Sequence, residues 1–479
     1  MTERAARGRG SVRRWLRRTA IAVMLLLIVL QIGAWLSSPR QENEPLPVHD
    51  PEGGYRFTTD DGAANRLFVC VTMSGGGTRA AAFSYGVLEE LLNTEIEWPP
   101  DSGRRVSLLS EVDILSASSG GSFTAAYYGL FKQRTFTDFR ERVLYRDITK
   151  DLFWRAMNPL RWPRLFRPDF SRSDLAAEYY QEKIFDGRRF SDLSRRPFVV
   201  INATNVAFGS GFSFSQSFFD YLGSNLATFP VGRAVAASSA FPLLLSPLTL
   251  RNHPPARGFD LPEDVKQALA GPQSKPRRYA QASRLAPYHL EKEGHPYLHL
   301  LDGALSDNLG LRYVIDSYLR GEIRTLLNRT PGGIDRLIVI VANAKGESDE
   351  DLDRDASPPG ETDVSYKTAT VSMDNYTFET LELMAEFLDQ RRQTQEMLEA
   401  VNQWRREAGM PELSQLPMIE SSLIEVSLEQ ISDLEERRAL LSVPTTLTLP
   451  RDVVDELINK GRELLRRHGE FQELIDTLR

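Results

Sequence analysis

Short apolar runs that favour β-strands alternate with helical patterns through the middle of this chain. The strand-like runs lie at residues 67–73, 112–115, 197–204 and 337–344. The helical patterns lie at residues 80–92, 122–132 and 231–237. Strands that alternate with helices in this way are typical of a largely parallel sheet with helices on both faces. The chain is therefore predicted to form a three-layer α/β/α core.

The N-terminus shows the sharpest change in composition. Residues 1–18 contain seven arginines, and residues 19–38 are uncharged and mostly apolar. This stretch approaches the roughly 20 residues that a helix needs to cross a bilayer. We expect a retained transmembrane helix with residues 1–18 in the cytoplasm and the remaining chain on the opposite face, which is the periplasm if the helix lies in a bacterial inner membrane. A cleaved signal peptide is the alternative, but its apolar region is usually shorter.

The rest of the chain divides by composition. A linker rich in proline, glycine and charge precedes the core, a polar and basic insertion interrupts it, and an acidic proline-containing loop follows it. After that loop, helical patterns occupy residues 373–406 and 450–478. The predicted units are a basic N-terminus at 1–18, a transmembrane helix at 19–38, a linker at 39–65, the core at 66–346 with a rim insertion at 251–296, an acidic loop at 347–363 and a C-terminal helical extension at 364–479.

Charge and cysteine content narrow the choice of partners. The net charge is -7, and no basic stripe with interleaved aromatic residues follows the first twenty residues, so we expect no nucleic-acid partner. Cys70, the single cysteine, lies in an apolar run and is expected to be a buried structural thiol. The acidic loop lacks the spacing of a calcium-binding EF-hand, and we expect no metal and no cofactor.

Three glycines, Gly75, Gly76 and Gly77, directly follow the first strand and open a helix. Glycines let the backbone approach a ligand closely, and amides at a helix N-terminus stabilise negative charge. The pattern of a nucleotide-binding P-loop is absent. This loop is suited to hold a phosphate or an oxyanion, although a tight strand-to-helix turn would have the same sequence.

A second strand-to-helix turn contains two serines. A nucleophilic serine at such an elbow needs small residues two positions before and two after it, because the turn is strained. Ala117 and Gly121 satisfy this rule for Ser119, and Ser116 and Gly120 satisfy it for Ser118. Spacing alone leaves both serines open as the nucleophile.

A third strand ends at Asp302-Gly303. A carboxylate next to a serine hydroxyl can act as a general base, and the following glycine leaves its approach unobstructed. Asp307 and Asn308 are expected to cap the turn that follows. His299, three residues before Asp302, is expected to point to the opposite face of its strand and to be structural. In a parallel sheet the carboxyl ends of strands meet at one edge, where all three motifs would converge.

Together these motifs resemble the patatin-like phospholipases, from about residue 66 to 344. The order is that of the family: a glycine-rich oxyanion loop, a G-x-S-x-G elbow and a D-G-[GA] motif. The resemblance implies a Ser-Asp dyad of Ser119 and Asp302. It also implies an oxyanion hole at Gly75, Gly76, Gly77, Thr78 and Arg79, and an elbow flanked by Ala117 and Gly121. Ser74, Ala117 and Ala304 depart from the common pattern without removing a reacting group.

The resemblance implies a lipid acyl hydrolase, a carboxylic ester hydrolase whose partners are a membrane and a phospholipid or other acyl-ester lipid. Residues 151–170 mix bulky apolar and basic side chains that could dock on headgroups or shape an acyl channel, with ordinary core packing as the alternative. A membrane-anchored scaffold without turnover and an esterase for non-lipid acyl groups are the competing functions.

Overall fold

The structure, a computed structural model, describes residues 43–57, 67–100, 102–165, 170–242, 244–271, 276–320, 334–346, 360–413 and 419–478, together with isolated residues outside these ranges. Most of the predicted transmembrane helix at 19–38 and of the acidic loop at 347–363 lies outside the described residues. Within the described ranges, no helix has both the length and the apolar character required to cross a bilayer.

The centre of the fold is an eight-stranded sheet in the order β10-β9-β1-β4-β5-β8-β7, with β6 paired to β5. The five strands from β10 to β5 are parallel, whereas β8 and β6 run antiparallel to β5, and β7 runs antiparallel to β8. The predicted α/β core with a mainly parallel sheet is therefore confirmed. The strands are β1 (Leu67–Met73), β4 (Val112–Ser118), β5 (Phe198–Asn205), β6 (Ser210–Ser213), β7 (Leu248–Arg251), β8 (Tyr297–Asp302), β9 (Arg336–Asn343) and β10 (Glu420–Ser427), with a separate hairpin of β2 (Glu95–Glu97) and β3 (Arg105–Ser107).

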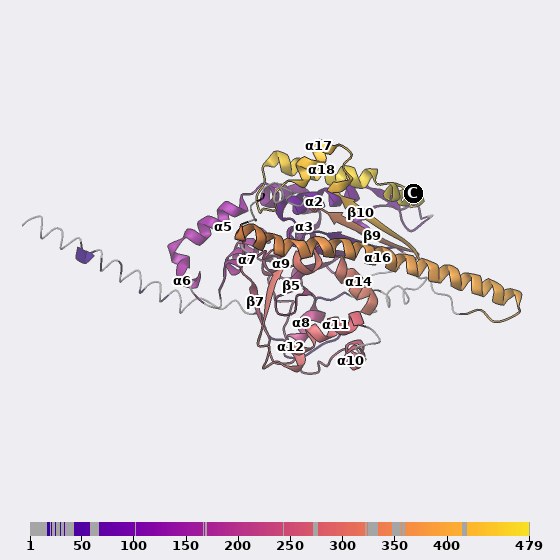
Figure 1. Ribbon diagram of the computed structural model, residues 1–479, viewed down its shortest axis with the longest axis horizontal. Coiled ribbons are helices and arrows are strands. Elements are labelled where there is room, and N and C mark those ends of the chain that lie inside the picture. The colour runs from indigo at the N-terminus through magenta and orange to yellow at the C-terminus, as the bar shows by residue number, and fades with distance from the viewer. Residues whose placement is uncertain are drawn as a thin grey trace, which may run out of the picture.

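Helices cover both faces of this sheet (Figure 1). Alternate residues of β1 enter two separate apolar cores: Val69 and Val71 pack with α2, α3 and α18, and Phe68 and Cys70 pack with α14 and α16. The helices are α2 (Gly77–Asn93), α3 (Gly120–Phe131), α4 (Thr135–Phe139), α5 (Ile148–Met157), α6 (Trp162–Leu165), α7 (Arg172–Lys183), α8 (Gln216–Tyr221), α9 (Val231–Ser238), α10 (Glu263–Ala270), α11 (Pro276–Leu285), α12 (Pro287–Leu290), α13 (Ala304–Asp307), α14 (Leu311–Arg320), α16 (Glu361–Glu407), α17 (Leu434–Leu441), α18 (Arg451–Arg467) and α19 (Gly469–Thr477). Cys70 is buried, as expected.

The C-terminal region is less purely helical than its sequence pattern indicates. Strand β10 pairs with β9 along its whole length and extends the main sheet. Only three of its eight residues are buried, so its sequence lacks the long apolar run that identifies a central strand. Helix α16 begins at Glu361, twelve residues before the predicted start at Met373, and extends beyond the body of the protein (Figure 1).

Residues 43–57, predicted to be linker, pack on the core. Tyr55 is buried against Phe198, and its hydroxyl accepts a hydrogen bond from the Val199 amide at 2.8 Å. The Asn43 side chain donates to Ser224 Oγ at 2.8 Å. Proline and glycine in this segment therefore mark turns in a packed segment, which composition alone does not distinguish from a free linker.

Candidate active site

Ser119 lies at the turn between β4 and α3, in a backbone conformation that residues other than glycine rarely adopt. Its φ and ψ angles are 48° and −120°. The neighbouring positions need glycine, because a Cβ on Gly121 would lie 2.7 Å from the Met73 Cβ and one on Gly120 would lie 2.0 Å from the Gly77 carbonyl oxygen. This is the strained elbow that the sequence predicts around Ala117 and Gly121.

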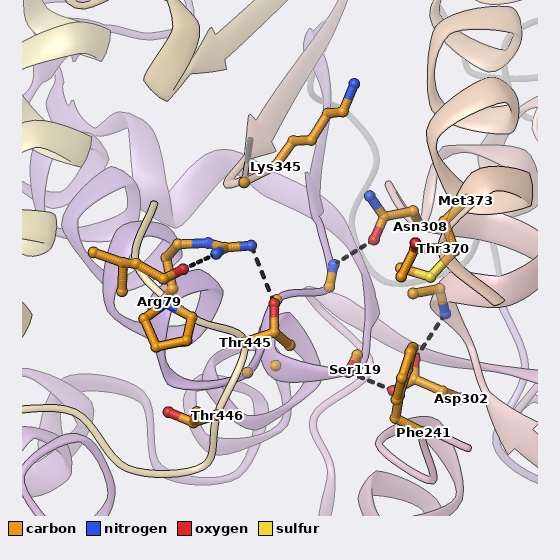
Figure 2. Close-up of a pocket in the computed structure, with 18 of the residues that line it drawn as sticks. Arg79, Ser119, Phe241, Asp302, Asn308, Lys345, Thr370, Met373, Thr445 and Thr446 are labelled. Atoms are coloured by element: carbon orange, nitrogen blue, oxygen red, sulfur yellow. Dashed lines mark hydrogen bonds between the residues drawn. The ribbon is translucent and has the colours of Figure 1, made fainter. Parts of the chain in front are cut away.

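The two candidate serines differ in their partners. Ser119 Oγ donates a hydrogen bond to Asp302 Oδ2 at 2.7 Å (Figure 2). Ser118 Oγ instead donates to the Asp307 carbonyl at 2.6 Å and is fully buried. Of the two serines that spacing leaves open, Ser119 is therefore the one that faces the carboxylate.

The strand that carries Asp302 runs in a direction that the sequence does not indicate. Strand β8 runs antiparallel to β5, so the expectation that Asp302 lies at the carboxyl end of a parallel strand is wrong. Nevertheless β8 ends level with β4, since Ala203 pairs with Asp302 and Asn202 pairs with Ser118. A Cβ on Gly303 would lie 2.2 Å from the Asn202 carbonyl oxygen, so glycine is required after the aspartate.

The surroundings of Asp302 disfavour its charged form. The residue is 1% exposed, and burial raises the pKa of its carboxyl to about 7, although hydrogen bonds from the Ala304 amide and the Ser119 hydroxyl act in the opposite direction. A carboxyl group with a pKa near neutrality can both accept and return a proton. His299, by contrast, is exposed on the opposite face of β8 from Asp302, as predicted, and its ring contacts Thr249; its structural role stays a prediction.

Three members of the expected oxyanion hole already have acceptors. The Gly75 amide donates to the Asn308 carbonyl at 2.9 Å, and the Thr78 amide donates to the Thr446 carbonyl at 2.8 Å. The Arg79 guanidinium is buried and donates to the Ala344 carbonyl, the Val443 carbonyl and the Thr445 hydroxyl. Thr78 and Arg79 thus fasten the glycine loop to neighbouring segments, and the assignment of these residues to the oxyanion hole stays a prediction.

Other amides around Ser119 remain available. Among the described residues, no hydrogen bond occupies the backbone N–H of Gly76, Gly77 or Gly120. Gly76 and Gly77 have φ angles of 135° and 59°, which glycine adopts without strain. The Gly77 and Gly120 backbones are in contact, and both begin helices. These amides form a donor set suited to an anion beside the Ser119 hydroxyl.

The profile of the patatin-like phospholipase family matches residues 71–315. The chain belongs to this family. The match contains the glycine loop, the elbow and Asp302, which are the motifs on which the sequence resemblance rests. No curated protein matches the chain significantly.

Several solved structures are similar to this patatin-like protein. Human GIVD cytosolic phospholipase A2 is 14% identical with a TM-score of 0.43, and the alignment covers 86% of this chain and 62% of that chain. The same human enzyme in complex with methyl gamma-linolenyl fluorophosphonate has a TM-score of 0.39 at 14% identity, with 87% and 59% covered. VipD from Legionella pneumophila is 11% identical with a TM-score of 0.31, with 92% and 72% covered. The chain thus spans about three fifths of the human chain.

The patatin-like core shares its pocket with the C-terminal region. Ser119 and Asp302 open into a cavity of about 840 Å³. Phe241, Leu244 and Leu245 give it an apolar wall from within the family match. The opposite walls come from α16 and from residues 438–447, which lie beyond the matched residues. Nothing in the sequence of these segments identifies them as pocket residues.

Outside the dyad and the glycine loop, most charged side chains that line the cavity are basic. They are Lys345, Lys367 and Arg438, and one acidic side chain, Asp374, lies among them. Lys345 and Asp374 form a long ion pair of 3.9 Å. Within the described ranges, no group of three or more His, Cys, Asp or Glu side chains could hold a metal ion.

Proposed function

We propose that this protein is a membrane-anchored lipid acyl hydrolase that cleaves carboxylic esters through an acyl-enzyme on Ser119, with Asp302 as the general base. The observation that carries the proposal is the 2.7 Å hydrogen bond from Ser119 Oγ to the buried Asp302 carboxylate, formed at a strained elbow. Membership of the patatin-like phospholipase family supports lipid acyl hydrolysis in general. The geometry of the site supports the Ser-Asp mechanism.

The reaction follows from the positions of these groups. Ser119 Oγ attacks the ester carbonyl carbon while its proton passes to Asp302 Oδ2. The carbonyl oxygen becomes an oxyanion that the free amides of Gly76, Gly77 and Gly120 can bind. The tetrahedral intermediate collapses, the alcohol leaves with the proton from Asp302, and the acyl group stays on Ser119. A water molecule, deprotonated by Asp302, then releases the fatty acid and restores the serine.

The walls of the cavity support a phospholipid or lysophospholipid as substrate. The apolar side chains of Phe241, Leu244 and Leu245 can accommodate an acyl chain. Lys345, Lys367 and Arg438 can attract the phosphate of a headgroup, because two of these three have no ion pair among the described residues. An anionic lipid fits these walls better than a neutral ester.

Anchoring and location are proposed from the sequence. Residues 19–38 would span the membrane once, with the arginines of residues 1–18 in the cytoplasm. The catalytic domain would then face the opposite side, the periplasm in a bacterial inner membrane. Tethering keeps the pocket near the interface in which acyl chains reside.

A fluorophosphonate probe and lipid profiling test the proposal together. Probe labelling is expected at Ser119, to be lost in Ser119→Ala and to persist in Ser118→Ala, which is the matched control. Lipids incubated with the wild-type protein, but not with Ser119→Ala, should release fatty acid. Absence of labelling in folded protein would favour a scaffold without turnover. Hydrolysis that falls steadily with acyl-chain length would favour a non-lipid esterase.

A further inference from the structure

Bulky apolar side chains are exposed on α5 and α6. The arm, defined here as residues 148–165, projects from the body of the protein (Figure 1). Phe153 is 56% exposed, Trp154 63%, Met157 49% and Trp162 40%. The alternative of ordinary core packing for this stretch is therefore wrong for these four residues. A cluster of this kind on a surface marks an interaction site.

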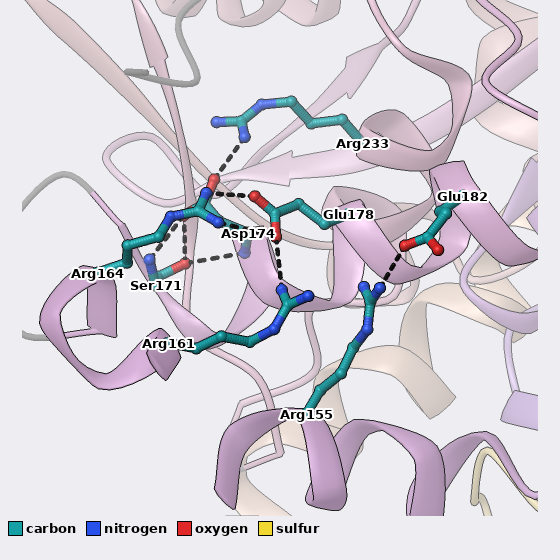
Figure 3. A network of polar contacts seen from close by, with 8 residues as sticks. All are labelled: Arg155, Arg161, Arg164, Ser171, Asp174, Glu178, Glu182 and Arg233. Atoms are coloured by element: carbon teal, nitrogen blue, oxygen red, sulfur yellow. Dashed lines mark hydrogen bonds and ion pairs between the residues drawn. The ribbon is translucent and has the colours of Figure 1, made fainter. Parts of the chain in front are cut away.

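Three arginines of the arm pair with carboxylates of α7 (Figure 3). Arg155 pairs with Glu182, and Arg161 and Arg164 both pair with Glu178. These arginines thereby lose most of their capacity to bind a second anion. The exposed surface of the arm includes the four bulky apolar side chains together with Thr149, Lys150 and Asn158.

The arm and the helix that supports it, α7, each contact a segment next to the walls of the catalytic cavity. At one end the Thr149 amide donates to Thr448 Oγ1 at 3.2 Å, directly after the cavity-lining segment that ends at Leu447. Ser173 of α7 donates to the Ser246 carbonyl, next to the cavity residues Leu244 and Leu245. Leu244 is 57% exposed. The cavity wall therefore also exposes an apolar side chain.

The first residue of the continuous described body lies near the helix that supports the arm. Asn43, the first residue of the continuous described body, accepts a hydrogen bond from the Arg251 amide of β7 at 2.7 Å. In the same strand, the Thr249 carbonyl accepts from Arg233, which also pairs with Asp174 of α7. Asn43 and the support of the arm therefore both contact one four-residue strand, β7.

We propose that the arm is an interfacial docking element whose partner is the lipid bilayer, entered by Phe153, Trp154, Met157 and Trp162 at the boundary between headgroups and acyl chains. Tryptophan and phenylalanine favour this boundary. Because the arginines are paired with α7, docking depends mainly on apolar burial and only weakly on salt. Docking itself does not depend on the proposed function, whereas its effect on turnover does.

Site-specific labelling tests the docking directly, because the only native cysteine, Cys70, is buried. Trp154→Cys carries an environment-sensitive fluorophore in the full chain reconstituted into phosphatidylcholine vesicles. Met397→Cys, 69% exposed on the projecting part of α16, is the control. The label at position 154 should shift to shorter wavelength and be quenched by brominated lipid, and the control label should not. Equal emission at both positions overturns the proposal, as does a shift that grows with protein density without lipid quenching, because a second copy would then cover the arm.

Turnover gives a second readout. The double substitution Phe153→Ser and Trp154→Ser should lower hydrolysis of vesicle-embedded lipid by about tenfold or more, because more than half of each side chain is available for burial. Hydrolysis of a monomeric short-chain ester should be unchanged. An equal effect on both substrates contradicts a docking role. If wild-type protein hydrolyses neither, the proposed function fails, while the labelling result still decides the docking.

Discussion

Asp302→Asn removes the negative charge of the proposed base and keeps the shape of its side chain. The amide has the size of the carboxylate and retains one oxygen for the Ala304 amide, which donates to Asp302 Oδ1 at 2.9 Å. It cannot accept the proton of Ser119 Oγ. Hydrolysis should therefore fall by at least about a thousandfold, since general-base assistance and nucleophile activation are both lost.

The same substitution is expected to stabilise the fold, and the structure gives the magnitude. Burial raises the pKa of Asp302 from 3.8 to about 7. The folded protein thus holds a proton that the unfolded chain has lost, so its stability falls as pH rises through this interval. At about 1.4 kcal/mol for each pKa unit, the ionised carboxylate costs roughly 4 kcal/mol above neutral pH.

Urea unfolding of the full chain in mild detergent measures this effect. The stability gain of Asp302→Asn over wild type should grow from roughly 2 kcal/mol near pH 5 to roughly 4 kcal/mol near pH 9. The change with pH isolates the charge, because differences in hydrogen bonding between Asp and Asn do not vary over this range. A gain that is independent of pH would refute a raised pKa at Asp302. Retained hydrolysis would refute its role as the base.

Four further outcomes follow from the site. Wild-type kcat/KM should increase with pH around 7, where Asp302 ionises, and a profile that is flat there contradicts the assignment. Gly77→Ala should lower hydrolysis about a hundredfold or more, because its Cβ would lie 2.2 Å from the Thr446 carbonyl oxygen beside the oxyanion amides. Ser118→Ala should keep kcat and lose about 1 kcal/mol of stability in urea, as one buried hydrogen bond disappears. Lys367→Gln should raise KM for phospholipid several-fold and leave KM for a neutral ester unchanged.

Local chemistry explains which parts of the fold could be predicted. Strands β1, β4, β5 and β9 are nearly continuous apolar runs because helices cover both faces of them, and such runs are visible in a single sequence. The elbow is visible for a similar reason, since glycine and alanine are the residues that its close contacts admit. Spacing could not separate Ser118 from Ser119. Their difference lies in partners almost two hundred residues away, Asp307 and Asp302.

Features that depend on distant contacts were missed. The direction of β8 is set by its pairing with β5 and β7, and no pattern within residues 297–302 encodes it. Strand β10 is half-exposed at the edge of the sheet, so it lacks an apolar signature. Arg79 follows the glycines as an oxyanion residue would, but two of its acceptors, Val443 and Thr445, are more than 360 residues away in sequence.

These contacts connect the C-terminal region to the candidate active site. The family match ends at residue 315, yet the glycine loop rests on residues 443–446. The Thr78 amide and the Arg79 side chain both donate to that segment, and Gly77 has no room for a Cβ because Thr446 lies against it. Helix α18, a few residues later, packs on α2, the helix that the glycines begin. Since oxyanion binding requires amides fixed in advance, the C-terminal region is a working part of the candidate active site and not an appended extension.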